Sequence, residues 1–179
     1  METVSQKRLN LLHLEGVGKT SIIKTIVTDN FPKGHVEKIF RTVTISPDLY
    51  LLPNNNNTIL VDSSSNKAHT QNTDAEIEKA SVIVLVYDLT NHDCIKNMRT
   101  TWLPRIVKIN EKVPIIICGN KMDLRSSAHE SEMESLLTAT FIDFKQVEMG
   151  IECSAKGYIG LIDIISCAQK AVLFPIAPL

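Results

Sequence analysis

Residues 13–20 read HLEGVGKT and stand between an apolar run and a helical pattern. They match the phosphate-binding pattern G-x-x-x-x-G-K-[ST] except at its first glycine, where this chain has His13. Glycines in such a loop let backbone N–H groups approach a phosphate, and the helix that follows adds a positive field. The pattern predicts that Lys19 contacts the phosphates and that the Thr20 hydroxyl binds Mg²⁺. A glycine-rich turn with a chance Lys-Thr pair is the alternative at this point.

A second candidate follows the apolar run at 113–119, where residues 120–123 read NKMD. The Asp123 carboxylate could accept hydrogen bonds from guanine N1–H and from the exocyclic amine, a pattern that adenine lacks. We expect Asn120 to tie this segment to the phosphate loop and the Lys121 stem to cover the face of the base. On its own, the segment could be a polar turn.

A third candidate is the sequence ECSAK at 152–156, where a backbone N–H could donate to guanine O6. Each of the three segments follows a predicted strand, and ligands bind at the carboxyl ends of strands in open α/β sheets. Their combination predicts a guanine-nucleotide site, with Lys19 as the catalytic candidate. The predicted nucleotide-binding residues are Glu15, Gly16, Val17, Gly18, Lys19, Thr20, Ser21, Asn120, Lys121, Asp123, Ser154, Ala155 and Lys156.

A metal site is predicted beside the phosphate loop. Asp62 ends a short β-rich run and could hold Mg²⁺ together with Thr20. Thr42 is the candidate from the preceding segment, with Thr44 as the second choice. Both could instead be ordinary strand threonines.

Short apolar runs alternate with helical patterns along the chain. This alternation predicts one α/β domain over residues 1–179, a three-layer sandwich around a mainly parallel six-stranded sheet. We expect Pro104 to kink or restart its helix and residues 131–134 to form a capping box. The strands are expected at 8–14, 43–52, 58–61, 81–87, 113–119 and 149–153, with 43–52 and 58–61 forming a hairpin, and the helices at 19–28, 74–79, 95–109, 131–140 and 161–172.

Composition excludes several classes of protein. The 179 residues carry a net charge of -1, whereas proteins that bind nucleic acid through its phosphates have a clear basic excess. No apolar run reaches the ~18 residues of a membrane span, so we expect no membrane contact by this chain. The four cysteines form no C-x-x-C pair, which favours reduced thiols in a cytosolic protein over a zinc site.

Together these motifs resemble the Ras-like small GTPases over the whole chain. The segments RTTWLP at 99–104, ECSAK at 152–156 and AQKAVLFP at 168–175 look like the N-terminal GTPase domain of the Miro (mitochondrial Rho-like GTPase) family. The resemblance implies a P-loop small GTPase fold and a switch that binds GTP/GDP with Mg²⁺. Switch segments 29–42 and 62–73 would contact effector and regulatory proteins.

The Miro resemblance also implies a longer protein. In such a protein EF-hands, a second GTPase domain and a membrane anchor would follow this domain. The domain would then lie on the cytosolic face of the mitochondrial outer membrane and act in mitochondrial transport or morphology.

Several residues depart from the pattern of the small GTPases. Glu15 stands where many relatives have glycine, and Ser65 and Asn66 replace the glycine and glutamine that sense the γ-phosphate and orient the attacking water. We therefore expect slow hydrolysis. The alternative is a non-hydrolysing GTP-binding module that serves as a protein-interaction platform.

Overall fold

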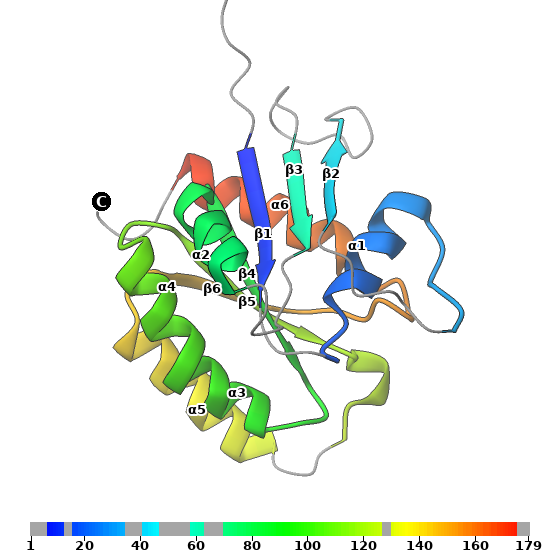
Figure 1. Cartoon of the computed structure of the whole chain (residues 1–179). Helices are drawn as coiled ribbons and strands as arrows, with labels where there is room; N and C mark the ends of the chain where they lie inside the picture. The colour runs from blue at the N-terminus through cyan, green and yellow to red at the C-terminus, as the bar shows by residue number, and fades with distance from the viewer. Residues whose placement is uncertain are drawn as a thin grey trace, which may run out of the picture.

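A computed structural model describes residues 7–12, 16–34, 41–46, 58–62, 70–126 and 130–174. Its six-stranded sheet has the order β2-β3-β1-β4-β5-β6, in which only the β2–β3 pair is antiparallel. This confirms the predicted fold class and the hairpin (Figure 1). The strands are β1 (Lys7–Leu12), β2 (Arg41–Ile45), β3 (Thr58–Asp62), β4 (Val82–Asp88), β5 (Ile115–Asn120) and β6 (Val147–Glu152).

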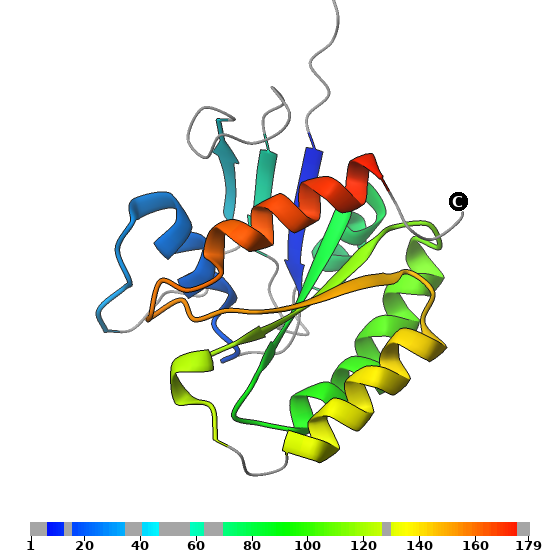
Figure 2. The same cartoon turned by 180° about the vertical axis from the view of Figure 1, so that it is seen from behind.

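Helices cover both faces of the sheet (Figures 1 and 2). On one face α1 packs on β3 and on α6, and α6 crosses β4, β5 and β6. On the other face α2 packs on β1, α3 on β4, and α5 on β6 and α3. The helical segments are α1 (Lys19–Thr28), α2 (Thr70–Lys79), α3 (Asp93–Asn97), the π-turn η3 (Met98–Trp102), α4 (Leu103–Ile109), the 3₁₀ turn η4 (Met122–Leu124), α5 (Glu130–Asp143) and α6 (Leu161–Leu173).

The core lies on both sides of the two central strands. Every residue of β4 and β5 is buried, as their continuous apolar sequences predict for strands covered on both faces. The apolar face of α6 completes the core, and its residues Ile164, Ile165 and Ala168 are fully enclosed. A rigid centre of this kind fixes the positions of the loops that leave the carboxyl ends of the strands.

Two helix starts differ from the sequence-based expectation. Helix α2 begins at Thr70 rather than at 74, so the predicted loop at 62–73 includes a helical turn. Thr73 and Ile77, four residues apart, are its buried side chains, and a threonine in the inward position conceals the helical period. Helix α5 begins at Glu130, which places Ser131 inside the first turn and makes the predicted capping box wrong.

Pro104 lies in the first turn of α4, which begins at Leu103, so the α-helix restarts at the proline as expected. The chain nevertheless remains helical from Asp93 to Ile109, and the π-turn η3 ends two residues before the proline. The Leu103 N–H reaches back five residues to the Met98 carbonyl, and this wider turn accommodates a residue that lacks an N–H donor. The expected inward face is confirmed at Ile95, Met98, Trp102 and Ile106, all buried.

The cysteines are free, as expected. Cys118 on β5 and Cys153 after β6 place their sulfur atoms 3.5 Å apart in the core. This sulfur–sulfur hydrogen bond and burial hold the pKa of Cys118 well above its usual range. Among the described residues, none of the helices has the length and apolar character needed to cross a membrane.

Candidate nucleotide-binding site

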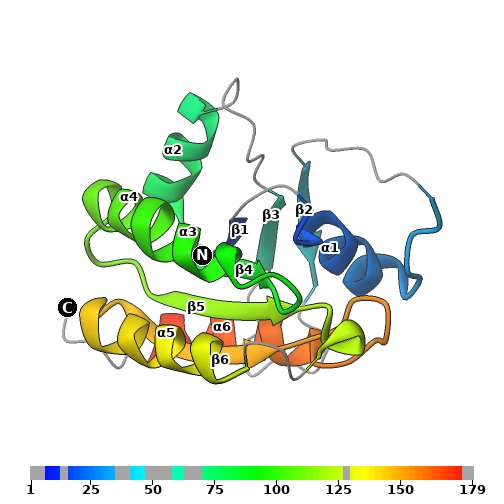
Figure 3. The ribbon, with the colours of Figure 1, turned by 90° about the horizontal axis from the view of Figure 1, so that it is seen from below.

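The predicted site residues gather at one edge of the sheet. Five strands run parallel to one another, so their carboxyl ends meet at the same edge of the sheet; they are β1, β3, β4, β5 and β6. Figure 3 looks at the molecule from below, onto this edge, where the start of α1 faces the turns that follow β5 and β6. The fold thus brings together loops that are more than 100 residues apart in the chain.

The loop before α1 requires its glycines. Gly16 and Gly18 adopt φ angles of 81° and 95°, which other residues rarely adopt. A Cβ atom on Gly18 would lie 2.4 Å from Asn120 Nδ2, so a side chain here would collide with the neighbouring loop. Lys19 opens the helix and is buried, and Ser21 is half-buried in the first turn. His13 and Glu15 lie outside the described residues.

Asn120 connects three loops through its carboxamide. The side chain is 2% exposed, and its Nδ2 donates to the Val17 carbonyl at 2.9 Å. Its Oδ1 accepts from the Ala155 N–H at 3.2 Å and from the Cys153 thiol at 3.5 Å. Because a buried amide without partners would destabilise the fold, this network holds the loops in register.

Asp123 lies in the 3₁₀ turn η4, which follows β5. The buried Ser154 hydroxyl donates to Asp123 Oδ1 at 2.6 Å, while the Asp123 side chain remains exposed. The Met122 N–H also donates to the Cys153 carbonyl at 3.0 Å, which joins the same two segments through the backbone. Lys156, the last residue of the third predicted segment, is exposed.

Asp88, which no sequence motif marks, holds Lys121 in place. Lys121 has a left-handed backbone, with φ 68°, and its Nζ lies 2.6 Å from Asp88 Oδ2. Burial raises the pKa of Asp88, but hydrogen bonds from Lys121 and Thr90 outweigh it, and the pKa stays below its usual range. The signal was a single carboxylate at the end of the apolar run of β4.

Thr20 and Asp62 meet at the candidate metal site. The Thr20 hydroxyl donates to Asp62 Oδ2 at 2.5 Å. Beside them lies a cavity of about 360 Å³ between α1 and the β2–β3 hairpin, lined also by Phe31 and Val43. A hydroxyl and a carboxylate suit Mg²⁺, which commonly takes one or two protein oxygens and completes its shell with phosphates and water.

The structure does not bring Thr42 together with this pair. Thr42 pairs with Val61 inside β2 and is exposed, and so is Thr44. Val43 faces the cavity, so its strand neighbours point to the opposite face of the sheet. Ser65 and Asn66 lie outside the described residues, as do 35–40 and 63–69 of the two predicted switch segments.

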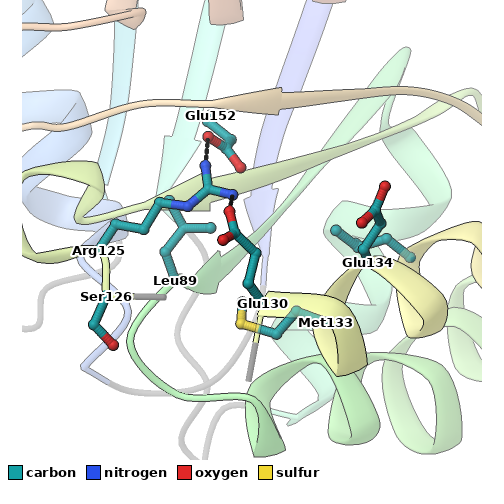
Figure 4. A pocket seen from close by; sticks show the side chains of 8 residues that line it. Leu89, Arg125, Ser126, Glu130, Met133, Glu134 and Glu152 are labelled. Atoms are coloured by element: carbon teal, nitrogen blue, oxygen red, sulfur yellow. Dashed lines mark hydrogen bonds and ion pairs between the residues drawn. The ribbon is translucent and has the colours of Figure 1, made fainter. Parts of the chain in front are cut away.

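A second cavity of about 280 Å³ is lined by Arg125 and Ser126, which follow the turn that carries Asp123, and by residues of α5 (Figure 4). Arg125 spans it and forms ion pairs with Glu152 at 2.6 Å and with Glu130 at 2.7 Å. All three side chains are partly exposed, so each pair contributes little to stability. Their effect is local, because they link the exit of this turn to β6 and α5.

Comparison with known proteins identifies the family. Residues 8–173 match the sequence model of the Ras family. The chain belongs to the Ras family. Family members bind GTP or GDP, typically with Mg²⁺, so this Ras-family domain is expected to bind guanine nucleotide and to contact regulatory or effector proteins.

The relatives of this Ras-family domain include proteins named Mitochondrial Rho GTPase 1, which confirms the resemblance to Miro. The chain is 36% identical to the one from Mycosarcoma maydis over 91% of its own length, and 35% identical to one from Cryptococcus neoformans over 96%. It is 32% identical to the one from Aspergillus oryzae over 92%. The domain covers only 21%, 25% and 26% of these relatives, respectively.

Proposed function

We propose that this domain is a guanine-nucleotide switch that binds GTP or GDP with Mg²⁺ and hydrolyses GTP slowly. The network around Asn120 carries the proposal, since it joins the loop before α1 to the two segments expected to hold the base. A nucleotide bound at this edge would contact all three loops.

In the proposed complex the base lies against the turns after β5 and β6. Asp123, held by Ser154, accepts the two guanine donors. The Ala155 backbone lies beside Asn120, where a loop N–H can meet guanine O6. The stems of Lys121 and Lys156 cover the faces of the base. Adenine would leave the Asp123 carboxylate without donors, so guanine is selected.

The phosphates lie at the start of α1, where unpaired backbone N–H groups and the helix dipole attract anions. Lys19 balances the negative charge that builds on the β–γ bridging and γ oxygens as water attacks in line at phosphorus. Thr20 and Asp62 would hold Mg²⁺, which neutralises phosphate charge. The catalysis therefore consists of positioning and electrostatics, and no residue of the chain is assigned to orient the water.

We expect hydrolysis to be slow without a partner protein, on the scale of about 10⁻⁴ s⁻¹ or below. Glu15 would repel charge that develops on the γ-phosphate, and Ser65 and Asn66 replace the usual glycine and glutamine. Single-turnover phosphate release from GTP-loaded protein measures the rate. A turnover of several per second would contradict this expectation. Exchanging Ser65 and Asn66 for Gly and Gln, with and without Glu15→Gly, separates the two causes.

The same three positions favour a second candidate function, a GTP-holding interaction platform without hydrolysis. They affect the γ-phosphate surroundings and leave the base pocket intact. The single-turnover experiment distinguishes the two functions. Bound GTP that remains unhydrolysed over many hours supports the platform, whereas slow conversion to GDP supports the switch.

We expect Asp88→Asn to weaken nucleotide binding about three- to tenfold. The variant replaces an ionic partner of Lys121 with a neutral one, which costs roughly 1 kcal/mol. Lys121 covers the base without reading its edge, so GTP and XTP should lose affinity by the same factor. Titration with both nucleotides checks this, with Asp93→Asn as a control, since Asp93 is exposed nearby. A change in base preference would contradict the assigned role of Asp88.

The biological context is proposed from the relatives' names. We place this single domain, residues 1–179, at the N-terminal end of a longer Miro-type protein on the cytosolic face of the mitochondrial outer membrane, with a role in mitochondrial transport or morphology. The partial coverage of these relatives supports a longer protein. Protease accessibility of the full protein on isolated mitochondria tests the placement.

A further inference from the structure

A hydrogen bond joins the base side of the site to the chain that leaves α1. The Phe31 N–H donates to the Tyr158 hydroxyl oxygen at 2.8 Å, across 127 residues of sequence. In Figures 1 and 3 the segment that follows α1 lies beside the loop between β6 and α6. Neither residue belongs to a sequence motif of the site.

The turn that carries Tyr158 is tightly organised. Ser154 and Ile159 exchange two backbone hydrogen bonds, at 3.0 and 3.1 Å, and the Gly157 N–H donates to Ser154 Oγ at 2.8 Å. Tyr158 has φ 59°, a left-handed conformation that costs energy in a residue other than glycine. Its side chain is 50% exposed, so burial does not account for this conformation. The turn directs the tyrosine ring toward Phe31.

The other end of the bond is anchored to the phosphate side. Phe31 lies three residues after the end of α1 and packs partly buried against the core. With Thr20 and Asp62 it lines the cavity between α1 and the β2–β3 hairpin. The chain between α1 and Phe31 turns through Asp29, whose φ is 51° and whose N–H donates to the Thr25 carbonyl at 2.9 Å. Phe31 therefore lies near the start of the first switch segment, residues 29–42.

These contacts form a continuous path. Asp123 accepts from Ser154, Ser154 closes the turn that carries Tyr158, and Tyr158 accepts from Phe31. The path links the Asp123 carboxylate, which is expected to bind the base, to the start of the first switch segment. In the proposed complex the nucleotide lies between these elements, so they have to separate before it is released.

We propose that Tyr158 is a positioning residue that holds the loop between β6 and α6 against the first switch segment and thereby slows nucleotide release. This inference rests on the proposed function. Removing one neutral, partly exposed hydrogen bond should raise the nucleotide dissociation rate about three- to fivefold. The association rate should not fall, because a bond that opens for release also has to open for entry. Base selectivity should also stay the same, because Asp123 remains in place.

The test is the Tyr158→Phe variant, which removes only the hydroxyl group. Release of a fluorescent GDP analogue in Mg²⁺ is followed after adding excess unlabelled GDP, and association is measured separately. Ile162→Ala is the control, since Ile162 is a nearby exposed apolar residue on α6. We expect faster release only in Tyr158→Phe, with an association rate that does not fall and an unchanged unfolding temperature.

The outcomes separate this inference from the proposed function. If the parent protein retains no GDP analogue, the proposed function fails. If the parent protein retains the analogue and Tyr158→Phe releases it at the parent rate, the proposed role of Tyr158 is wrong. A lower unfolding temperature and slower association in Tyr158→Phe would show that Tyr158 has a purely structural role. This result would also contradict the proposal.

Discussion

Asp123→Asn is expected to lower the affinity for GTP by about a hundred- to ten-thousandfold and to raise the affinity for XTP. The carboxylate accepts two guanine donors, and charge-assisted hydrogen bonds contribute about 1.5–3 kcal/mol each. An asparagine can still accept the Ser154 hydroxyl through its carbonyl oxygen, so the turn should keep its shape. Its amide group would then face the base, where it repels the exocyclic amine of guanine and donates to the 2-oxygen of xanthine.

Competition binding with GTP, XTP and ATP measures this change. Asp163→Asn is a suitable control, because Asp163 is an exposed carboxylate in the first turn of α6. The control should bind all three nucleotides as the parent does. An Asp123→Asn protein that keeps the parental preference for GTP would show that this carboxylate does not read the base.

Lys19→Ala is expected to weaken binding of both GTP and GDP by about ten- to a hundredfold. The lysine is 7% exposed at the start of α1, and its charge should meet phosphate oxygens in a site with little competing water. The loss should be equal for guanine and xanthine nucleotides, since Lys19 is expected to contact the phosphates, which the two nucleotides share. This pattern differs from that of Asp123→Asn, which changes base preference.

Titration with a fluorescent GDP analogue, in the presence of Mg²⁺, checks the Lys19 prediction. Lys108→Ala provides the control because Lys108 is an exposed lysine in the last turn of α4. Unchanged affinity in Lys19→Ala would mean that the loop before α1 does not bind the phosphates. Circular dichroism of both variants confirms that any loss of binding does not come from unfolding.

Features that a residue pattern or a motif marks could be predicted from the sequence. The apolar runs of β4 and β5 indicated strands buried on both faces, and the inward face of α6 followed from its helical period. The arrangement of the loops also followed, because strands that alternate with helices place their carboxyl ends at one edge. Asn120 was correctly expected to tie this edge together, and its bond to Val17 is the contact found.

Features that no residue pattern or motif marks could not be predicted. The first turn of α2 has polar residues, and only packing of Thr73 into the core reveals its period. The π-turn before Pro104 is a backbone adjustment that no residue pattern specifies. Asp88 and Tyr158 gain their roles from Lys121 and Phe31, which lie 33 and 127 residues away.

The measurement that tests the central claim most directly is the affinity of the unmodified domain for GTP and for ATP in Mg²⁺. The Asp123 carboxylate, fixed by Ser154, predicts that GTP binds at least a hundredfold more tightly than ATP, because adenine leaves this carboxylate without its two donors. Competition against a fluorescent GDP analogue gives both constants in one experiment. Equal affinity for GTP and ATP would contradict the assignment of this edge of the sheet as a guanine-nucleotide site.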